Sequence, residues 1–416
     1  MLDDTCAPVA WRFYMAALRT NPQLQFVKYR SKSRDFIPLY EPTITEEMRQ
    51  AVLQGFDERL WIRGSREWDS QGRRFEEEVC QFIGCKYAVN MTSGTAALLL
   101  ALKAWGIGPG DEVITAPNTF PAPTDVIMWT GATPVYVDIE LDSYCMDVSK
   151  VEAAITPRTK AIMPVDAHGH AADLDALMEI ATRHNLHLVD DSCQAIGAGY
   201  KGSKLGTHGH CATFSYTRNK PMFCGGDGGL LVTNDKQLAE TIWMLANHGR
   251  GPRYYEGSMA EVAYRALEHE ISGLNFRQSE VLSAVARVTL RSLQAWNERR
   301  RELAARYTRL IHALDTDIAP PQEKPYAWHS YWRYVIRTPK RDKLRLFLSK
   351  HVETKPTYHT PNHLDRVPRT KYGFKEGDFP VSERYARENL ALPMYPALTE
   401  EDVDFVVGRI EAFYRS

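Results

Sequence analysis

Short apolar runs alternate with longer segments of helical periodicity between residues 73 and 233. Apolar residues recur three or four positions apart in 73–83, 96–105 and 174–184, which indicates helices. Seven short apolar runs have the length of buried strands: 87–89, 111–115, 133–138, 161–165, 186–190, 212–215 and 229–233. Short strands separated by helices imply βαβ units. The pattern therefore predicts an α/β fold whose large domain has a mostly parallel seven-stranded sheet with helices on both faces.

The periodicity changes on either side of this region. A helix capped by Thr43 or Thr45 is expected to run to about residue 53. A long helical pattern covers 278–314, and we interpret it as the connection to a smaller α+β domain. That domain is expected to contain a strand at 334–336 and a final helix that begins after Leu398-Thr399, with acids in its first turn.

These patterns divide the chain into an N-terminal arm (1–35), a large domain (36–290) and a small C-terminal domain (291–416). The arm is weakly patterned, so it is either a loose extension or a stretch before a true start at Met15. A length of 416 residues agrees with two or three domains.

Composition excludes several classes of function. The net charge of −1 provides no basic field for nucleic acid or an anionic membrane. No apolar run reaches the length of a membrane span, and the first residues carry acids where a signal peptide needs positive charge. The seven cysteines are odd in number and form no CxxC pair, so we expect no disulfide framework and no metal site. Reduced thiols favour a cytoplasmic protein.

Candidate chemistry centres on Lys220, which follows Ser215 by five residues and precedes the glycine-rich segment 225–229. A lysine in a loop is usually a solvated charge, so only its neighbours give it meaning. Upstream, Asp191 ends an apolar run. Pyridoxal phosphate requires an amine for a Schiff base, an acid for its ring nitrogen and donors for its phosphate. The chain offers candidates for all three.

Asp191 has competing explanations. It could cap the following helix, and Asp190, one residue earlier, competes for the same role. Adjacent residues on a strand point to opposite faces, so only one of the two can reach a given site. Spacing favours Asp191, because Gln194 three residues later could then hydrogen-bond the 3-hydroxyl of the cofactor.

A strand that ends in Ser93-Gly94-Thr95 and opens a helix forms a candidate phosphate site. Backbone N–H groups and the helix dipole favour an anion there, and glycine permits its close approach. Ordinary N-capping is the commoner explanation for such a segment. Ser215 would add a hydroxyl to the phosphate, and Phe120 would stack on the pyridine ring unless it belongs to the core.

From about Ile37 to Tyr414 the chain resembles the DegT/StrS family of sugar aminotransferases, which depend on pyridoxal phosphate and have the aspartate aminotransferase (type I) fold. The resembling segments are 74–78, 92–98, 110–114, 134–138, 191–202, 225–235, 273–277 and 392–396. The resemblance implies Lys220 as the Schiff-base lysine and Asp191 as the partner of the ring nitrogen. It also implies Gln194 at the 3-hydroxyl, Phe120 in the stacking position, and Gly94, Thr95 and Ser215 around the phosphate.

Two further implications concern assembly and substrate. In the resembling family the asparagine of the Gly-x-Asn-x-Arg motif, here Asn275, reaches the phosphate from the partner subunit. A homodimer with shared active sites is therefore expected. His329 lies in the segment that approaches the substrate.

The resulting hypothesis is ping-pong transfer of an amino group from glutamate or glutamine to a keto sugar, nucleotide-linked or a cyclitol, in antibiotic or polysaccharide biosynthesis. Three segments depart from the family pattern around the expected substrate entrance: 119–125, 164–170 and 217–219. They motivate an alternative, in which the same fold performs elimination, cyclisation or decarboxylation on an amino acid. A third reading, a non-catalytic regulator that kept the fold, conflicts with the retained Lys220 and Asp191.

Overall fold

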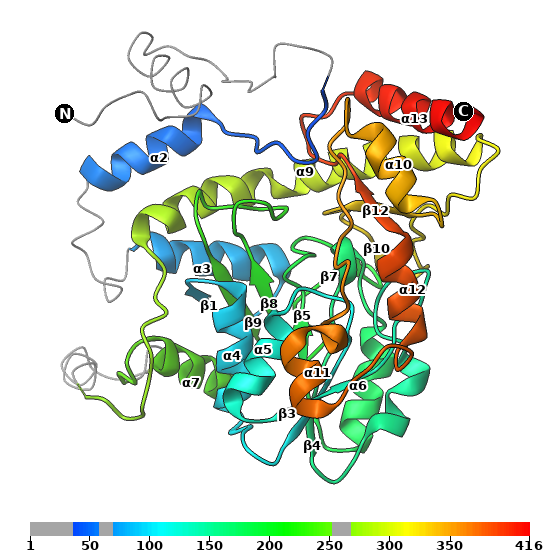
Figure 1. Cartoon of the computed structure of the whole chain (residues 1–416). Helices are drawn as coiled ribbons and strands as arrows, with labels where there is room; N and C mark the ends of the chain where they lie inside the picture. Colours follow the sequence, from blue (N-terminus) through cyan, green and yellow to red (C-terminus); the bar gives the residue numbers. More distant parts are fainter. Residues whose placement is uncertain (1–35, 58–69, 252–267) are drawn as a thin grey trace, which may run out of the picture.

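The computed structural model describes residues 36–57, 70–251 and 268–416 (Figure 1). The predicted arm at 1–35 lies outside the described residues. In the described part of the chain, no helix combines the length and the apolar character needed to cross a bilayer.

A seven-stranded sheet forms the centre of the molecule, with strand order β1-β9-β8-β5-β4-β2-β3. Its strands are β1 (Tyr87–Met91), β2 (Glu112–Thr115), β3 (Thr133–Tyr136), β4 (Thr159–Met163), β5 (His187–Asp191), β8 (Cys211–Ser215) and β9 (Gly229–Thr233). Strand β9 runs antiparallel to both neighbours, and the pairs from β8 to β3 are parallel. Each predicted strand is found, and the predicted α/β class is confirmed.

Helices cover both faces of this sheet, because successive strand residues are apolar on both sides. Leu231 packs with α4, α5 and α7, whereas its neighbours Leu230 and Val232 pack with α3 and α9. The helices are α2 (Glu46–Asp57), α3 (Gln71–Ile83), α4 (Gly94–Ala104), α5 (Ala122–Thr130), α6 (Leu174–Arg183), α7 (Lys236–Ala246) and α9 (Glu280–His312). Continuous burial on two faces explains why the strands read as uninterrupted apolar runs.

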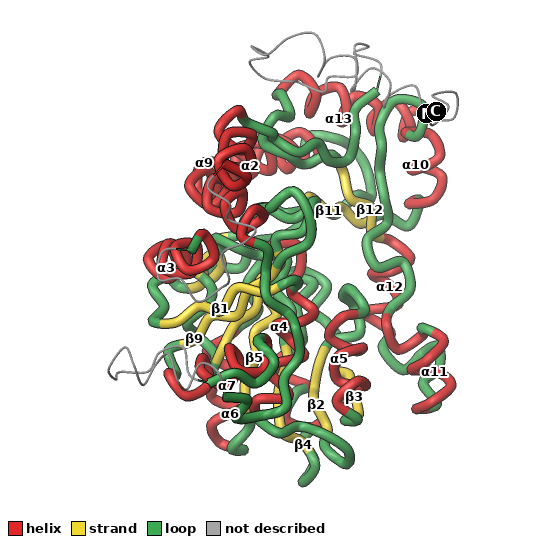
Figure 2. The backbone as a smooth tube through the Cα atoms, turned by 90° about the vertical axis from the view of Figure 1, so that its left-hand side faces the viewer, coloured by secondary structure: helices red, strands yellow, loops and turns green. Residues whose placement is uncertain are grey.

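Helix α9 extends beyond the sheet and leads to the C-terminal part, where β11 and β12 pair antiparallel beside α10 and α13 (Figure 2). The elements there are β10 (Ala327–Trp328), β11 (Tyr334–Arg337), α10 (Arg341–Leu348), α11 (Arg366–Tyr372), α12 (Pro380–Glu388), β12 (Asn389–Leu392) and α13 (Glu400–Arg415). The predicted start of the last helix is confirmed, since Thr399 and Asp402 form a capping box. The proposed boundary between 290 and 291 falls inside α9 and stays a prediction.

Smaller elements complete the structure. Strand β10 pairs with β6 (Gly199–Tyr200), which pairs with β7 (Ser203–Lys204), so the C-terminal part is joined to the large sheet region. The short 3-10 helices are η2 (Val148–Lys150), η3 (Glu152–Ala154), η4 (Ala167–Gly169) and η5 (Asn362–Leu364).

Candidate active site

A cavity of about 960 Å³ opens where β5, β8 and the helix α4 meet. Asp191 ends β5, Ser215 ends β8, and Gly94 begins α4, so the cavity lies at the carboxyl edge of the parallel strands. This is the edge at which open α/β sheets bind ligands. The lining contains Gly94, Thr95, Phe120, Asp191, Gln194, Ser215 and Lys220 among the residues predicted from sequence.

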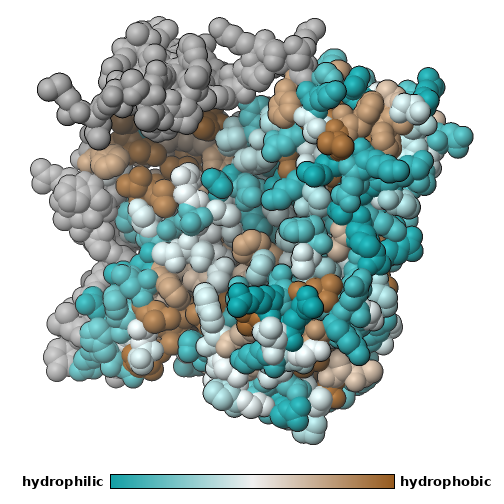
Figure 3. All heavy atoms as spheres, viewed as in Figure 1, coloured by the Kyte–Doolittle hydropathy of each residue, from teal (hydrophilic) through white to brown (hydrophobic). Residues whose placement is uncertain are grey.

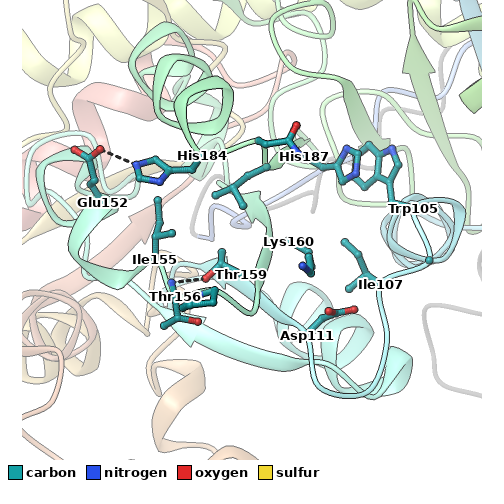
Figure 4. A pocket seen from close by; sticks show the side chains of 14 residues that line it. Trp105, Ile107, Asp111, Glu152, Ile155, Thr156, Thr159, Lys160, His184 and His187 are labelled. Atoms are coloured by element: carbon teal, nitrogen blue, oxygen red, sulfur yellow. Dashed lines mark hydrogen bonds and ion pairs between the residues drawn. The ribbon is translucent and has the colours of Figure 1, made fainter.

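A second cavity, of about 690 Å³, lies at the opposite edge of the sheet (Figure 4). Its walls come from the amino ends of the strands, with Asp111 just before β2, Lys160 in β4 and His187 opening β5. His187 stacks on Trp105 with 4.3 Å between ring centroids. None of the residues predicted to carry chemistry lines this cavity.

Lys220 is half-buried, and its amine lies 4.1 Å from the centroid of the Trp332 ring. Burial lowers the pKa of Lys220 to about 8, and the positive charge of Arg333 acts in the same direction. The negative charge of Asp191 opposes this shift without cancelling it. A substantial fraction of the amine is therefore neutral near pH 8, the form that attacks an aldehyde.

The structure separates the two neighbouring acids. Asp191 lines the cavity and accepts a hydrogen bond from the Cys193 backbone N–H (3.1 Å). Asp190 points to the other face of the strand, where the Ser192 hydroxyl lies 2.9 Å from its Oδ2 and 2.6 Å from Asp166 Oδ2. Burial raises the pKa of Asp191, and a cationic partner in the cavity would offset that cost. This geometry places Asp191, not Asp190, where a ring nitrogen could meet it.

A backbone N–H group of the segment after β4 holds the side chain of Gln194. The His168 N–H donates to Gln194 Oε1 (2.9 Å), and Gln194 Nε2 lies 3.5 Å from the Thr119 hydroxyl. His168 has a left-handed backbone (φ 57°), an uncommon state for a residue with a side chain. Burial lowers the pKa of His168 to about 3, so its imidazole is neutral.

The first turn of α4 fits a phosphate group. Ser93 caps the helix, because its hydroxyl accepts a hydrogen bond from the Ala96 N–H (3.1 Å). The N–H groups of Gly94 and Thr95 lie in the first turn and therefore have no intrahelical partners. A side chain at Gly94 would place its Cβ 2.5 Å from Cys193 Sγ and 3.0 Å from Ser215 Cβ. Gly229 is equally necessary, because a Cβ there would collide with the backbone of Ser93. The close approaches at Gly94 and Gly229 surround the first turn of α4, and together with its free N–H groups they form one anion-binding cradle.

This cradle, together with Lys220 and Asp191, accommodates the phosphate, the aldehyde and the ring nitrogen of pyridoxal phosphate. The three groups come from different strands, as the sequence pattern predicts. Their roles toward the cofactor are proposals developed below.

Three predicted residues do not lie where a simple contact with the cofactor or substrate would put them. Phe120 lines the cavity, but 59% of its side chain is exposed. Asn275 lies outside the lining and is exposed, although the adjacent Phe276 carbonyl accepts from the Thr92 N–H (2.9 Å). His329 is buried away from the lining, where its ring stacks on Tyr331 at 3.9 Å. Its substrate role stays a prediction.

Several lining residues escaped sequence reasoning. Trp332 and Arg333 reach the cavity from the segment before β11, and Tyr358 and Asn362 reach it from the segment before α11. They lie more than 100 residues after Lys220 and carry no motif. One local signal exists in the structure: Tyr358 has a positive φ of 54°, a strained state that often marks functional sites.

Comparisons with known proteins agree with this geometry. The model of the DegT/DnrJ/EryC1/StrS aminotransferase family matches residues 42–411. A pleiotropic regulatory protein of Geobacillus stearothermophilus is 38% identical over 373 residues, or 89% of this chain and 96% of that protein. A dTDP-3-amino-3,4,6-trideoxy-alpha-D-glucose transaminase of Streptomyces venezuelae is 40% identical over 328 residues, or 78% of this chain and 82% of the relative.

Solved structures give the same result. The crystal structure of S. venezuelae DesV in complex with a ketimine intermediate is similar with a TM-score of 0.81 and 37% identity. The match covers 89% of this chain and 95% of that chain. A DegT DnrJ EryC1 StrS aminotransferase from Brucella abortus is similar with a TM-score of 0.79 at 31% identity, covering 89% and 96% of the two chains.

Proposed function

The chain belongs to the DegT/DnrJ/EryC1/StrS aminotransferase family and is an aminotransferase dependent on pyridoxal phosphate, and we propose that it aminates a keto sugar with glutamate or glutamine as donor. The observation that carries this proposal is the cavity in which Lys220, Asp191 and the start of α4 converge. The relative from S. venezuelae is named for a dTDP-linked amino sugar, which supports a nucleotide-linked acceptor.

A few residues of the cavity account for the chemistry of this reaction. When bound, pyridoxal phosphate supplies the electron sink and carries the amino group between the two half-reactions. Lys220 would hold the cofactor through Nζ and, when its amine is free, would move a proton from the donor's α-carbon. The pKa of Lys220, lowered to about 8, allows the amine both to accept and to return that proton near neutral pH.

Asp191 and the phosphate cradle keep the cofactor oriented. The buried carboxylate of Asp191 stabilises a proton on the ring nitrogen, and the charge pair offsets the burial that raises its pKa. The N–H groups of Gly94 and Thr95 and the hydroxyl of Ser215 hold the phosphate. Gln194 binds the 3-hydroxyl, and Phe120 covers one face of the ring.

The direct experiment follows the half-reaction with glutamate. Purified protein loaded with pyridoxal phosphate is expected to release one equivalent of 2-oxoglutarate per site, and addition of a dTDP-, UDP- or GDP-linked keto sugar is expected to yield the amino sugar. Release of ammonia or carbon dioxide from the donor would instead support elimination or decarboxylation. A protein that binds no pyridoxal phosphate would support the regulatory reading, which the name of the Geobacillus relative also suggests.

We also propose that the protein is a homodimer in which Asn275 completes the partner's cavity. Asn275 is exposed and outside its own cavity, yet its chain segment lies beside the turn at Thr92 that precedes the phosphate cradle. The exposed apolar side chains of Phe120 and Trp129 are the kind that subunit contact buries. Figure 3 shows hydrophobic side chains gathered on the left-hand part of one face, whereas hydrophilic ones cover most of the right-hand part.

Subunit mixing tests this arrangement. Lys220→Ala and Asn275→Ala homodimers are both expected to be inactive or strongly impaired. If the site is shared, a mixed dimer contains one intact site, with Lys220 from one subunit and Asn275 from the other, and random mixing restores about a quarter of wild-type activity. Absence of any recovery, with dimers verified by light scattering, would place both residues in the same subunit's site.

A reducing compartment, the cytoplasm, is the proposed location. The six cysteines in the described residues are all free, which agrees with a compartment that keeps thiols reduced. The test is fluorescence microscopy of a tagged chain in the source cell, and a periplasmic or extracellular signal would refute the proposal.

A further inference from the structure

Two buried acids, Asp166 and Asp190, lie beside lining residues of the main cavity without lining it themselves, and we call them the acid pair. Asp166 follows β4, and Asp190 belongs to β5. The Ser192 hydroxyl lies between them, 2.6 Å from Asp166 Oδ2 and 2.9 Å from Asp190 Oδ2. The other carboxyl oxygen of Asp190, Oδ1, has no hydrogen-bond partner within the described ranges 36–57, 70–251 and 268–416. Three oxygens that can each accept a hydrogen bond therefore meet in one buried place.

Counting hydrogens shows that at least one carboxyl of the acid pair is protonated. A serine hydroxyl has one hydrogen, so Ser192 donates to only one of the two carboxyl oxygens. The other oxygen is also within hydrogen-bonding distance of Ser192 Oγ, and only a proton on that carboxyl makes the second contact favourable. Burial raises the pKa of Asp166 to about 7, and burial together with the charge of Asp166 raises the pKa of Asp190. Both shifts agree with the count.

The titratable groups that face the acid pair are acidic or neutral in the part of the chain that the structure describes. Asp191, the next residue of β5, raises the pKa of both acids further. The thiols of Cys145 and Cys211 face Asp166 and Asp190, respectively. Burial and these charges raise the pKa of both thiols, which are therefore uncharged. The acid pair thus reduces its buried charge by holding a proton of its own.

The carboxyl of Asp166 connects the two segments that hold the side chain of Gln194. Its Oδ1 accepts a hydrogen bond from the Ala172 N–H (2.8 Å), which closes a loop around His168. The N–H of His168 is the donor to Gln194 Oε1 (2.9 Å). Its Oδ2 contacts Ser192, which lies two residues before Gln194. One carboxyl therefore fixes both the donor and the acceptor of the bond that orients the Gln194 amide.

The backbone of Asp166 makes a separate contact. Its N–H donates to the Asp191 carbonyl (3.1 Å), and this bond stays in place when the side chain is shortened. The loop itself is strained, since His168 has a positive φ of 57°, which residues with a side chain seldom adopt. A strained turn keeps one conformation only when its surroundings fix it, and the Asp166 carboxyl is a contact that joins this turn to the end of β5.

We propose that the acid pair shares one proton and thereby positions Gln194 for the cofactor. This inference rests on the proposed function, in which Gln194 binds the 3-hydroxyl. The shared proton allows Asp166 to approach Ser192 while Asp190 occupies another side of the same hydroxyl. Without that proton, repulsion between two buried carboxylates would separate the segment after β4 from the end of β5. The His168 N–H would then move away from Gln194.

Infrared spectroscopy of the cofactor-loaded protein tests the proton. At about pH 8 ordinary carboxyls are ionised, so a protonated carboxyl in the acid pair gives a separate absorption band that moves on transfer to heavy water. Asp190→Asn is expected to lose this band, because its amide supplies the hydrogen instead. A wild-type spectrum without a band that Asp190→Asn removes would overturn the shared proton.

A double-mutant cycle on the affinity for pyridoxal phosphate tests the positioning. Gln194→Ala removes the contact at the 3-hydroxyl itself and is expected to weaken binding about 10-fold. Asp166→Ala is expected to weaken binding to a similar degree in the wild-type chain, and by less than about twofold in a chain that already carries Gln194→Ala. Ser192→Ala cuts the same link without removing either acid, so it provides the same cycle if Asp166→Ala does not fold.

Two further measurements separate positioning from a loss of stability. Asp166→Asn keeps an acceptor for the Ala172 N–H and offers an N–H to Ser192. It is therefore expected to recover cofactor affinity to within about threefold of wild type. The visible absorption of the bound cofactor is expected to shift in the same direction in Asp166→Ala and Gln194→Ala, because both variants lose the contact at the 3-hydroxyl.

A matched control lies just after β3. Asp138 is also buried, and its Oδ1 accepts from the Ser382 hydroxyl (2.6 Å) and from the Ser382 N–H (2.8 Å), but it does not line the cavity. Asp138→Ala is expected to lower the thermal midpoint through the loss of these bonds. Its affinity for pyridoxal phosphate is expected to equal that of its parent, with or without Gln194→Ala.

The positioning role is refuted if the losses of affinity in Asp166→Ala and Gln194→Ala add, if Gln194→Ala binds the cofactor as wild type does, or if Asp166→Asn recovers nothing. Failure of the proposed function is separate. A protein that passes these tests but aminates no keto sugar would leave the role of the acid pair standing. Normal amination of a keto sugar, together with additive losses in the cycle, would remove this inference alone.

Discussion

Gly94→Ala tests the phosphate cradle most sharply, because the structure gives the size of the conflict. The new Cβ would lie 2.5 Å from Cys193 Sγ and 3.0 Å from Ser215 Cβ. Ordinary contacts between such atoms are about 3.5–4.0 Å, so the start of α4 or the loop after β5 must move by about 1 Å. Overpacking of this kind costs roughly 1–3 kcal/mol, and the displaced atoms are those that surround the phosphate.

If most of this cost falls on the bound state, pyridoxal phosphate binds Gly94→Ala about 10-fold to 100-fold more weakly. The assay is titration of the apoprotein with the cofactor, followed by absorbance, with thermal melts of the apoprotein recorded in parallel. Because Cys193 Sγ is the nearest atom, Cys193→Ala in the same chain is expected to restore at least half of the lost binding free energy.

A second glycine provides the control. Gly408 lies inside α13, and a Cβ built there meets nothing within 4 Å. Gly408→Ala is expected to stabilise the protein by about 1 kcal/mol through helix propensity, with cofactor affinity unchanged. Wild-type cofactor affinity in Gly94→Ala, with a wild-type melting temperature, would refute the reasoning.

Three further predictions concern titratable groups. Asp191→Asn is expected to lower kcat with glutamate at least about 100-fold at saturating cofactor, whereas Asp190→Asn, on the opposite strand face, is expected to retain most activity. Burial raises the pKa of Asp166 to about 7, above its usual 3.8, so the stability it provides is complete below about pH 4 and is lost as the pH rises through about 7. Burial and the charge of the nearby Asp166 also raise the pKa of Asp190, so Asp190→Asn removes the repulsion between the two carboxylates. The thermal midpoint of Asp190→Asn relative to wild type is expected to rise as the pH increases from about 4 to about 7, and a difference that does not change with pH would contradict this coupling. The rate at which apoprotein takes up pyridoxal phosphate is expected to increase with pH and level off above about 8, since neutral Lys220 is the reactive form; a rate independent of pH between 6 and 9 would refute this.

The strands, and most of the predicted residues that line the main cavity, could be found from the sequence for one physical reason. Both faces of the sheet are buried, so each strand is a compact apolar run, and the chemistry follows directly where such a run ends. Asp191 after β5 and Ser215 at the end of β8 are examples. Alternation along the strand also predicts that Asp190 and Asp191 point to opposite faces, and the spacing to Gln194 favours Asp191.

Two helices and several residues of the cavity lining were not predicted from the sequence. Helix α5 was not predicted; Pro121 is its N-cap residue and Pro123 lies in its first turn, where proline is well tolerated. Helix α7 was missed despite the capping residue Asp235. Trp332, Arg333 and Tyr358 reach the cavity only through the path of the C-terminal segment, which no local pattern encodes.

The identity of the residue that holds the cofactor is the central claim, and one measurement addresses it directly. Protein loaded with pyridoxal phosphate is reduced with borohydride, digested and analysed by mass spectrometry. We predict that the reduced cofactor is attached to the peptide containing Lys220, and that Lys220→Ala yields no attachment. An adduct on another lysine, or none on the wild-type protein, would contradict the account.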